Sequence, residues 1–264
     1  MIGSPLDYAE CSLLAQEVGK NLLSRLDWLK LDPQVIADMG CGTGELTGLL
    51  ASRYPMARII GIDHHPAMLA YARQQVAAPV DWLLADSARV PLPDHALGFI
   101  YSNFLLPWHT SVPNLFQEWR RLLRPNSLLM LSSLGPDTLQ EWRDYLHPED
   151  SLSMVDMHEM GDALMQLGFV DPVLEVEHYT LTYQDPTKFL HELTSCELLT
   201  VSSLVNSSPL RAAIQQRAEH GELTATFEVV YCHAWTPATE GYQQDEAGLA
   251  RVPLSHLRRQ IRGG

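Results

Sequence analysis

Cysteine, long apolar runs and positive charge are all scarce in this 264-residue sequence. Its four cysteines lack C-x-x-C spacing, which argues against a zinc site or a disulfide framework and predicts reduced, mostly buried thiols. No apolar run approaches the length of a membrane span, and no basic segment with an apolar core opens the chain, so we expect a cytoplasmic protein without a membrane partner. A net charge of −14 disfavours nucleic acid as a partner.

Apolar residues, by contrast, are plentiful at 46%, and their spacing alternates between strand and helix along the chain. Residues 35–132 predict five strands separated by helices, which is typical of a parallel sheet covered on both faces. Two more strands are expected over 172–183 and 224–235, and further helices over 8–31, 137–146, 156–167 and 186–199. We therefore predict an α/β fold with a doubly wound, mostly parallel, Rossmann-like sheet of seven strands and a helical lid.

One segment carries a clear sign of a ligand. A strand from Val35 reaches Asp38 and is followed by Gly40, Gly42 and Gly44 and then by a helical pattern. Glycines there allow a sharp turn that brings backbone N–H groups and a helix N-terminus against a small anion. A dinucleotide fold would place its third glycine where Glu45 stands. The pattern instead resembles motif I of class I S-adenosylmethionine (SAM) methyltransferases; the alternative is an ordinary glycine loop of an α/β protein.

An acidic residue ends each of the first three predicted strands. We expect Asp38 to lie near the amino group of the ligand, Asp63 to accept both ribose hydroxyls, and Asp86 to accept a hydrogen bond from the adenine amine. Each of them, taken alone, could equally be a helix cap or a turn residue. After the fourth strand, Tyr101, Phe104 and Trp108 are available to face a sulfonium cation.

The adjacent histidines His64 and His65 are expected to be turn residues rather than metal ligands, because neighbouring side chains diverge and no third ligand has suitable spacing. His64 is placed near the ribose, and Met68 either covers the adenine or belongs to the core. We predict no metal site. The expected cofactor-binding residues are Asp38, Gly40, Cys41, Gly42, Asp63, His64, Met68, Asp86, Ser87, Asn103 and Phe104.

Motifs beyond the cofactor segment resemble one family more closely. The segments 135–143, 156–164, 171–173, 181–183 and 226–235 are similar to the malonyl-acyl-carrier-protein O-methyltransferases of biotin synthesis, the BioC family. The resemblance implies one methyltransferase domain over 1–264. Its parts would be an N-terminal helix or lid at 1–31, a SAM-binding core at 32–135, lid helices and final strands at 136–235, and an irregular tail at 236–264.

This resemblance implies transfer of methyl from SAM to the free carboxylate of a malonyl group on acyl-carrier protein. The acceptor is already an anion at neutral pH, so no catalytic residue is required beyond alignment and exclusion of water. Arg143 matches the arginine of the family after Asp-Thr-Leu and is expected to hold the carboxylate; the alternative is a salt bridge on a lid helix. Tyr8, just ahead of the first helix, is expected to close over the ligand or else to cap the core.

The overall negative charge means that an acidic carrier protein needs a local basic patch. Arg120, Arg121 and Arg124 are the expected docking patch, with the C-terminal arginines from Arg251 to Arg262 as the other cluster; either can be only a solvated face. The chain departs from the family pattern at 193–209 and at the short segment before Tyr8, where part of the lid is expected to be missing. Other functions therefore stay open: a hydroxylase-like assembly factor, a non-catalytic SAM-binding protein, or a carboxyl methyltransferase of another acid.

Overall fold

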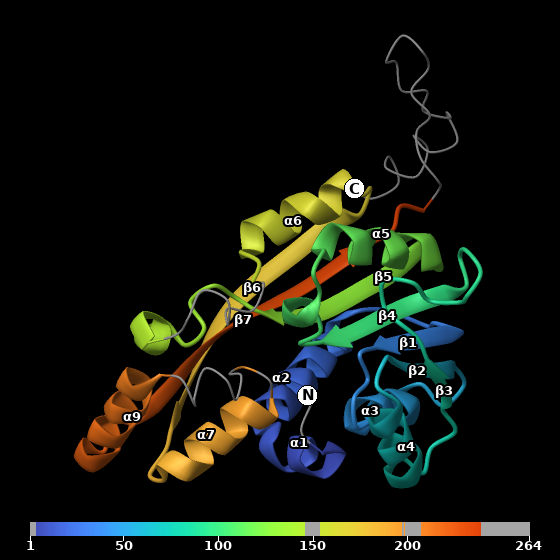
Figure 1. Cartoon of the computed structure of the whole chain (residues 1–264). Helices are drawn as coiled ribbons and strands as arrows, with labels where there is room; N and C mark the ends of the chain where they lie inside the picture. Colours follow the sequence, from blue (N-terminus) through green and yellow to red (C-terminus); the bar gives the residue numbers. More distant parts are fainter. Residues whose placement is uncertain (1–3, 146–153, 197, 199–206, 239–264) are drawn as a thin grey trace.

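A seven-stranded sheet forms the centre of the molecule in the computed structural model, which describes residues 4–145, 154–196, 198 and 207–238 (Figure 1). The strand order is β3-β2-β1-β4-β5-β7-β6. Strands β1 to β5 are parallel, whereas β7 runs antiparallel to both β5 and β6. The strands are β1 (Val35–Met39), β2 (Arg58–Asp63), β3 (Asp81–Leu84), β4 (Leu97–Asn103), β5 (Leu123–Leu134), β6 (Val170–Thr182) and β7 (Thr224–Trp235). The predicted sheet is thereby confirmed.

The burial of each strand follows its place in the sheet. The central strands are covered on both faces, so β1, β4 and β5 read as nearly continuous apolar runs that are mostly buried. At the edge, β6 alternates between half-buried and exposed positions, as a strand covered on one face does. The carboxyl ends of β1, β2 and β4 therefore meet at one edge, where a ligand of an open sheet binds.

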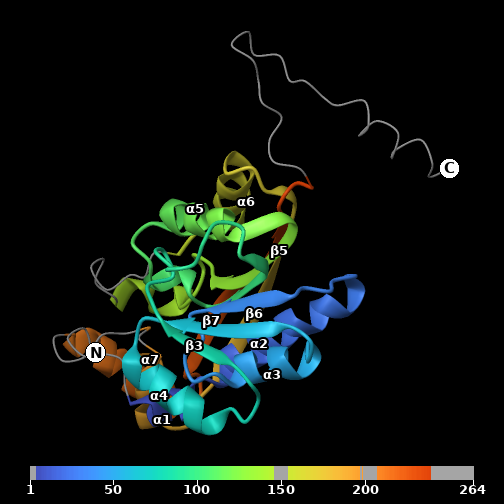
Figure 2. The ribbon, with the colours of Figure 1, turned by 90° about the vertical axis from the view of Figure 1, so that its right-hand side faces the viewer.

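Helices cover both faces and divide the apolar residues into two cores. One core lies between the sheet and α2, α3, α7 and α9, and the other between the sheet and α5 and α6 (Figures 1 and 2). The α-helices are α1 (Pro5–Cys11), α2 (Leu13–Ser24), α3 (Glu45–Arg53), α4 (Pro66–Gln75), α5 (Val112–Leu122), α6 (Met157–Gln166), α7 (Pro186–Ser195) and α9 (Ser208–His220). The 3-10 helices within the described residues are η1 (Arg25–Trp28), η2 (Leu106–Trp108) and η3 (Gln140–Tyr145).

The N-terminal helix expected over 8–31 is wrong in detail, because it is broken at Ser12. Helix α1 opens with a capping box in which Ser4 and Asp7 satisfy each other's backbone N–H groups. Ser12 leaves the helical region at φ −84° and ψ 32°, and its N–H closes α1 on the carbonyl of Tyr8. As a result α1, which buries none of its residues, lies against α7, while α2 packs on α3 and the sheet.

Two other parts of the chain differ from the expected elements, and a third expectation lies largely outside the described residues. The helix α9 was not predicted, since its buried stripe consists of only Leu210, Ala213 and Ile214 among polar residues. The helix expected over 137–146 is the short 3-10 helix η3. The irregular tail expected at 236–264 lies outside the described residues from 239 onward. None of the described helices is both long and apolar enough to cross a membrane, and the cytoplasmic location stays a prediction.

Candidate functional site

The glycine loop between β1 and α3 is bent tightly over the end of β2. The N–H groups of Gly40 and Cys41 both donate to the carbonyl of Ile62, at 2.8 and 3.0 Å. Gly40, Gly42 and Gly44 all have positive φ angles of 73°, 52° and 82°, which only glycine adopts without strain. This is the backbone that the glycine spacing predicts.

Two of these glycines serve different purposes. A Cβ at Gly44 would lie 2.8 Å from the Cβ of Ala72 and 2.8 Å from the ring of Trp82, so this glycine allows α3 to approach α4 and β3. A Cβ at Gly42 would meet only the ring of Tyr8, at 3.8 Å. Gly42 therefore faces the space below Tyr8 of α1 without a side chain of its own, so a ligand placed there could approach the backbone closely.

Helix α3 points its N-terminus at that space. Its N-cap is Gly44, which has no side chain, so no side-chain hydrogen bond caps the first turn. The unpaired N–H groups and the positive end of the helix dipole favour an anionic group such as a carboxylate. The loop and helix thus fit a ligand that carries a carboxylate.

Asp38 lies near the end of β1 and is almost fully buried, with 2% of its surface exposed. The hydroxyl of Thr47 donates to its Oδ2 at 2.5 Å. Burial raises the pKa of Asp38 to about 7; the hydrogen bond from Thr47 opposes this rise and the nearby carboxylate of Asp63 adds to it. A nearby cation would stabilise the ionised carboxylate of Asp38, and the protonated amino group of an amino acid is a suitable cation.

Asp63 is the last residue of β2, and its carboxylate holds the loop in shape. Its Oδ2 accepts from the N–H of Gly42 at 2.9 Å and its Oδ1 from the N–H of His65 at 2.8 Å. A carboxylate has about four lone-pair positions, so two further hydrogen bonds from a diol remain possible. Asp63 thus stabilises the loop and can still accept hydrogen bonds from a ligand.

The residues predicted for the ribose and adenine end lie just after β2, in α4 and after β3. Asp86 is exposed and lies two residues beyond β3, which ends at Leu84; its Oδ1 accepts from the N–H of Ala88 as in a turn. The prediction that Asp86 ends the strand is therefore wrong. Ser87 is buried and its carbonyl accepts from the indole of Trp119. His64 has a mostly exposed side chain, whereas Met68 is buried in α4.

Two N-terminal helices cover the glycine loop and leave a space of about 40 Å³ beneath them. Asn103 lies at the end of β4 beside this space and is fixed by two bonds: its Nδ2 donates to the carbonyl of Ala15 and its Oδ1 accepts from Ser132. Tyr8 lies within α1, not ahead of it as expected. The space is lined by Tyr8, Ser12, Ala15, Gln16, Asp38, Gly40, Cys41, Gly42, Thr43, Glu45, Leu46 and Asn103. The glycine loop is thus closed by α1 and α2.

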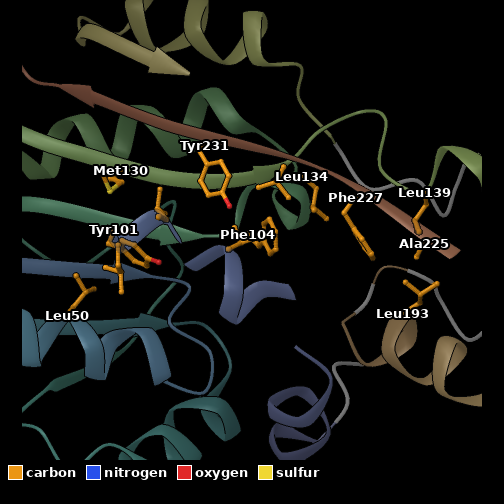
Figure 3. Packing of buried hydrophobic residues seen from close by; sticks show 14 of the residues in the cluster. Leu50, Tyr101, Phe104, Met130, Leu134, Leu139, Leu193, Ala225, Phe227 and Tyr231 are labelled. Carbon is orange, nitrogen blue, oxygen red and sulfur yellow. The ribbon is translucent and has the colours of Figure 1, made fainter. Parts of the chain in front are cut away.

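A much larger cavity of about 880 Å³ lies next to it, between the sheet and α7. Figure 3 shows Phe104, Leu134 and Phe227 along the sheet side and Leu193 on the opposite side. The cavity shares Tyr8, Ser12, Ala15 and Gln16 with the small space, so one helical cover borders both. Trp108 also lines it, but Tyr101 does not: its ring is fully buried and its hydroxyl donates to the carbonyl of Gly19.

Arg143, expected to hold a carboxylate, does not line this cavity in the described part of the chain. It lies in η3, where its Nη2 donates to the carbonyl of Pro136 at 2.8 Å and lies 3.5 Å from Asp137 Oδ1. Its side chain is 62% exposed. Arg143 is thus accessible to solvent but is held by its own segment.

The cluster of Arg120, Arg121 and Arg124 spans the end of α5 and the start of β5, at the opposite end of β4 from Asn103. Arg124 donates to the carbonyls of His95 and Ala96, just before β4 begins. Arg121 pairs with Asp94 and Glu118 and donates to two backbone carbonyls. Two of the three guanidinium groups therefore satisfy the chain's own acceptors, at the amino ends of the strands.

Of the residues singled out in the sequence, Tyr8, Phe104 and Trp108 line the large cavity, but most of its walls could not be found because they come from segments far apart in the chain. The cavity gathers residues from α1, α2, β5, β6, α7 and β7, and Lys188, Tyr183 and Cys196 are among them. The one usable signal was the cap Asp185-Pro186, which marks the start of α7. Burial raises the pKa of the Cys196 thiol to about 12, so this cysteine is an unreactive part of the wall.

Comparison with known families gives matches over both halves of the chain. A family model described as a methyltransferase domain matches residues 37–131. A malonyl-[acyl-carrier protein] O-methyltransferase of Nitrosospira multiformis is 34% identical over 261 residues, covering 88% of this chain and 85% of the relative. One of the same name from a Methylovorus species is 36% identical over 250 residues, covering 87% and 84%.

Solved structures share the fold at low sequence identity. Haemonchus contortus phosphoethanolamine N-methyltransferase 2 in complex with S-adenosyl-L-methionine matches with a TM-score of 0.55 at 17% identity, over 84% of this chain and 52% of that one. The [4+2]-cyclase SpnF matches with a TM-score of 0.53 at 16% identity, over 84% and 81%. One fold thus serves different reactions, and these likenesses concern the fold alone.

Proposed function

The chain belongs to the malonyl-[acyl-carrier protein] O-methyltransferase family, and we propose that it methylates the free carboxylate of a malonyl group on acyl-carrier protein in biotin synthesis. It is a SAM-dependent methyltransferase. The observation that carries the proposal is the large apolar cavity bordering the glycine loop, which gives a thioester substrate a place beside the cofactor site.

The residues at the glycine loop fit SAM in three respects. The N-terminus of α3 suits its carboxylate, the buried Asp38 suits its ammonium group, and Asp63 at the end of β2 has acceptor capacity for the ribose hydroxyls. Gly40, Cys41 and Gly42 would contact it through the backbone, with Asn103 and Phe104 at the carboxyl end of β4. His64, Met68, Asp86 and Ser87 are the proposed residues for the ribose and adenine end.

The covering helix α1 has to be displaced for SAM to bind. A space of about 40 Å³ is far smaller than the several hundred Å³ of an ordinary ligand site. Helix α1 buries none of its residues and is joined to α2 through the non-helical Ser12, so little packing opposes its movement. Tyr8, which faces Gly42, would then close over the bound ligand.

The chain needs no general base for this reaction. When bound, SAM supplies a methyl group on a positively charged sulfur. The acceptor carboxylate is ionised at neutral pH, and the residues of the chain have only to align it and exclude water. Phe104, Leu134 and Phe227 provide the water-excluding wall on the sheet side.

Arg143 stays our candidate for holding the acceptor carboxylate. Its planar guanidinium suits a bidentate contact, but it would have to leave Pro136 and Asp137 to reach the cavity. Arg143→Ala is expected to abolish methyl transfer while SAM affinity in calorimetry stays nearly unchanged. A parallel loss of SAM affinity would assign Arg143 a structural role.

Docking of the carrier protein on Arg120, Arg121 and Arg124 receives little support from the geometry. Two of these side chains are engaged, and they lie at the amino end of β4 while the cavity opens near its carboxyl end. The proposal remains testable, because charge reversal of the third arginine, Arg120, would then weaken methyl transfer to the carrier-protein substrate.

A single assay tests the function. The purified chain is incubated with methyl-labelled SAM and malonyl-acyl-carrier protein, and the ester product is measured, with acetyl-acyl-carrier protein as a control lacking the carboxylate. Label in the malonyl product alone is expected. SAM binding in calorimetry without label in either product would refute the proposed reaction.

A further inference from the structure

Lysine is the rarest charged residue of the sequence, and its distribution is uneven. The chain has Lys20, Lys30 and Lys188 and no other lysine. Two of these, Lys20 from α2 and Lys188 from α7, line the large cavity. They are its only lysine or arginine side chains among the described residues, in a chain of net charge −14.

The two lysines differ in their partners. The ammonium of Lys20 lies 3.1 Å from the carboxylate of Glu45, the first residue of α3, so its charge is already paired beside the glycine loop. Lys188 is exposed and has no carboxylate within ion-pair distance in the part of the chain that the structure describes. Exposed residues that line the cavity mark the open rim of its mouth, and Lys188 lies on the α7 side of this rim while Glu17 and Lys20 lie on the α2 side.

The acidic residues near Lys188 on the same helix have other partners. Asp185 is the N-cap of α7, and its Oδ1 accepts from the N–H of Thr187 at 2.8 Å. Glu192 forms a side-chain hydrogen bond with Tyr183. Both contacts draw these carboxylates to their own neighbours and leave the Lys188 ammonium available to an anion from outside.

The ends of the cavity have different characters. Its inner end adjoins the cofactor space at Tyr8, Ser12, Ala15 and Gln16, so the methyl acceptor has to lie there. Between that end and Lys188 the wall includes the apolar side chains of Leu134, Phe227 and Leu193 (Figure 3). A substrate that fits this cavity would be extended and would enter from α7. It would have an anionic group at the mouth, an uncharged chain along the apolar wall and the methyl acceptor at the inner end.

The prosthetic arm of an acyl-carrier thioester has this order of groups: a phosphodiester, a neutral pantetheine chain and the acyl group. We propose, on the basis of the proposed function, that the cavity holds the pantetheine chain and that Lys188 binds the phosphodiester at the mouth. Lys188 then determines that the substrate is a phosphopantetheine thioester, and acts in binding rather than in the chemical step. The cavity volume of about 880 Å³ lies within the range of sites that enclose a ligand of this kind.

The test compares two probes that differ only in the phosphate. Binding of 4′-phosphopantetheine and of pantetheine is measured by calorimetry on the chain saturated with S-adenosylhomocysteine. The wild-type chain should bind the phosphorylated probe roughly three- to tenfold more tightly, as expected for one charge-assisted contact at a partly exposed site. Lys188→Ala should remove this preference, Lys188→Arg should keep it, and the exposed Lys30→Ala should leave it unchanged.

Turnover gives a second, independent measurement. With S-malonyl-4′-phosphopantetheine, Lys188→Ala should raise KM roughly three- to tenfold at constant kcat, and with S-malonyl-pantetheine it should change neither. An equal change for both substrates, an effect seen only with the intact carrier protein, or no phosphate preference in the wild-type chain would overturn the proposal. If the wild-type chain binds the phosphorylated probe through Lys188 but transfers no methyl group to a malonyl thioester, the proposed function fails and this site stands.

Discussion

Replacing Asp38 with asparagine tests whether the buried carboxylate of β1 costs stability until a cation reaches it. Asp38 is 2% exposed and its hydrogen-bond partner is the neutral hydroxyl of Thr47. Burial raises its pKa from 3.8 to about 7. The native chain therefore holds a proton on Asp38 over a pH range in which the unfolded chain releases it.

The sign of the effect follows from this difference. Between about pH 4 and pH 7 the unfolded state binds fewer protons at this site than the native state, so the free energy of unfolding falls as pH rises. Each pH unit inside that window lowers the free energy of unfolding by about 1.4 kcal/mol. Between pH 5 and pH 8, about two pH units lie below the native pKa of about 7. Over these two units the free energy of unfolding of the wild-type chain falls by about 3 kcal/mol because of Asp38. A neutral amide at this position does not titrate, so the Asp38→Asn variant lacks this loss.

Urea unfolding at pH 5 and pH 8, without SAM, measures the effect. The stability of Asp38→Asn relative to the wild-type chain should increase by about 3 kcal/mol between the two pH values. Asp162→Asn, on the exposed face of α6, is the matched control and should show no such change. Other titrating groups are common to both chains and cancel in the comparison, so a pH-independent difference would refute the reasoning.

The same carboxylate makes a prediction for binding. If the ammonium group of SAM lies beside Asp38, binding favours the ionised carboxylate and releases a proton below a pH of about 7. SAM affinity should then rise from about pH 5.5 to about pH 7.5 in the wild-type chain. Asp38→Asn should bind SAM more weakly and without this pH dependence, and calorimetry in buffers of different ionisation enthalpy should detect the released proton.

Three further substitutions test other parts of the site. Gly44→Ala should destabilise the chain by about 2–4 kcal/mol in urea, because it adds overpacking against Ala72 to a positive φ of 82°, whereas Gly168→Ala, with a φ of 80° and open space, should cost only about 1 kcal/mol. Asp63→Ala should reduce SAM affinity at least about tenfold in calorimetry and lower the melting temperature, since the N–H groups of Gly42 and His65 lose their acceptor; unchanged SAM affinity would remove Asp63 from the ribose site. Arg121→Ala should lower the melting temperature without changing KM for malonyl-carrier protein, because its partners are internal; a raised KM would restore the arginine cluster as the docking patch.

The cofactor half of the site could be predicted because its determinants are local in sequence. Gly40, Gly42 and Gly44 lie close together in one turn, and their spacing specifies the positive φ angles that the structure has. Asp63 ends the mostly apolar strand β2, whose parallel pairing with β1 brings it to the loop. In the glycine loop, the local sequence and the pairing with the neighbouring strand favour the same backbone geometry. The loop can therefore be predicted without knowledge of long-range packing.

The substrate half could not be predicted, because long-range packing creates it. Lys188 becomes a cavity residue only when α7 packs across β6, β7 and the N-terminal helices. Arg143 was chosen from a linear motif, but the short helix η3 holds its guanidinium on Pro136. The break at Ser12 is likewise not visible in the sequence, because a continuous amphipathic pattern runs through residue 12. We attribute the break to the packing of α1 against α7.

The position of α1 couples the two halves of the site. Tyr8, Ser12, Ala15 and Gln16 border both the small space at the glycine loop and the large cavity, and Tyr8 belongs to α1, so displacement of α1 by a cofactor also moves Tyr8 at the inner end of the cavity. The fixed part of this border is Asn103, which joins the end of β4 to Ala15 of α2 and to Ser132 of β5. We expect α1 to move about the non-helical Ser12 while Asn103 holds α2 on the sheet. Any interaction that orders α1 over the bound cofactor will therefore also shape the place where the acceptor carboxylate has to lie.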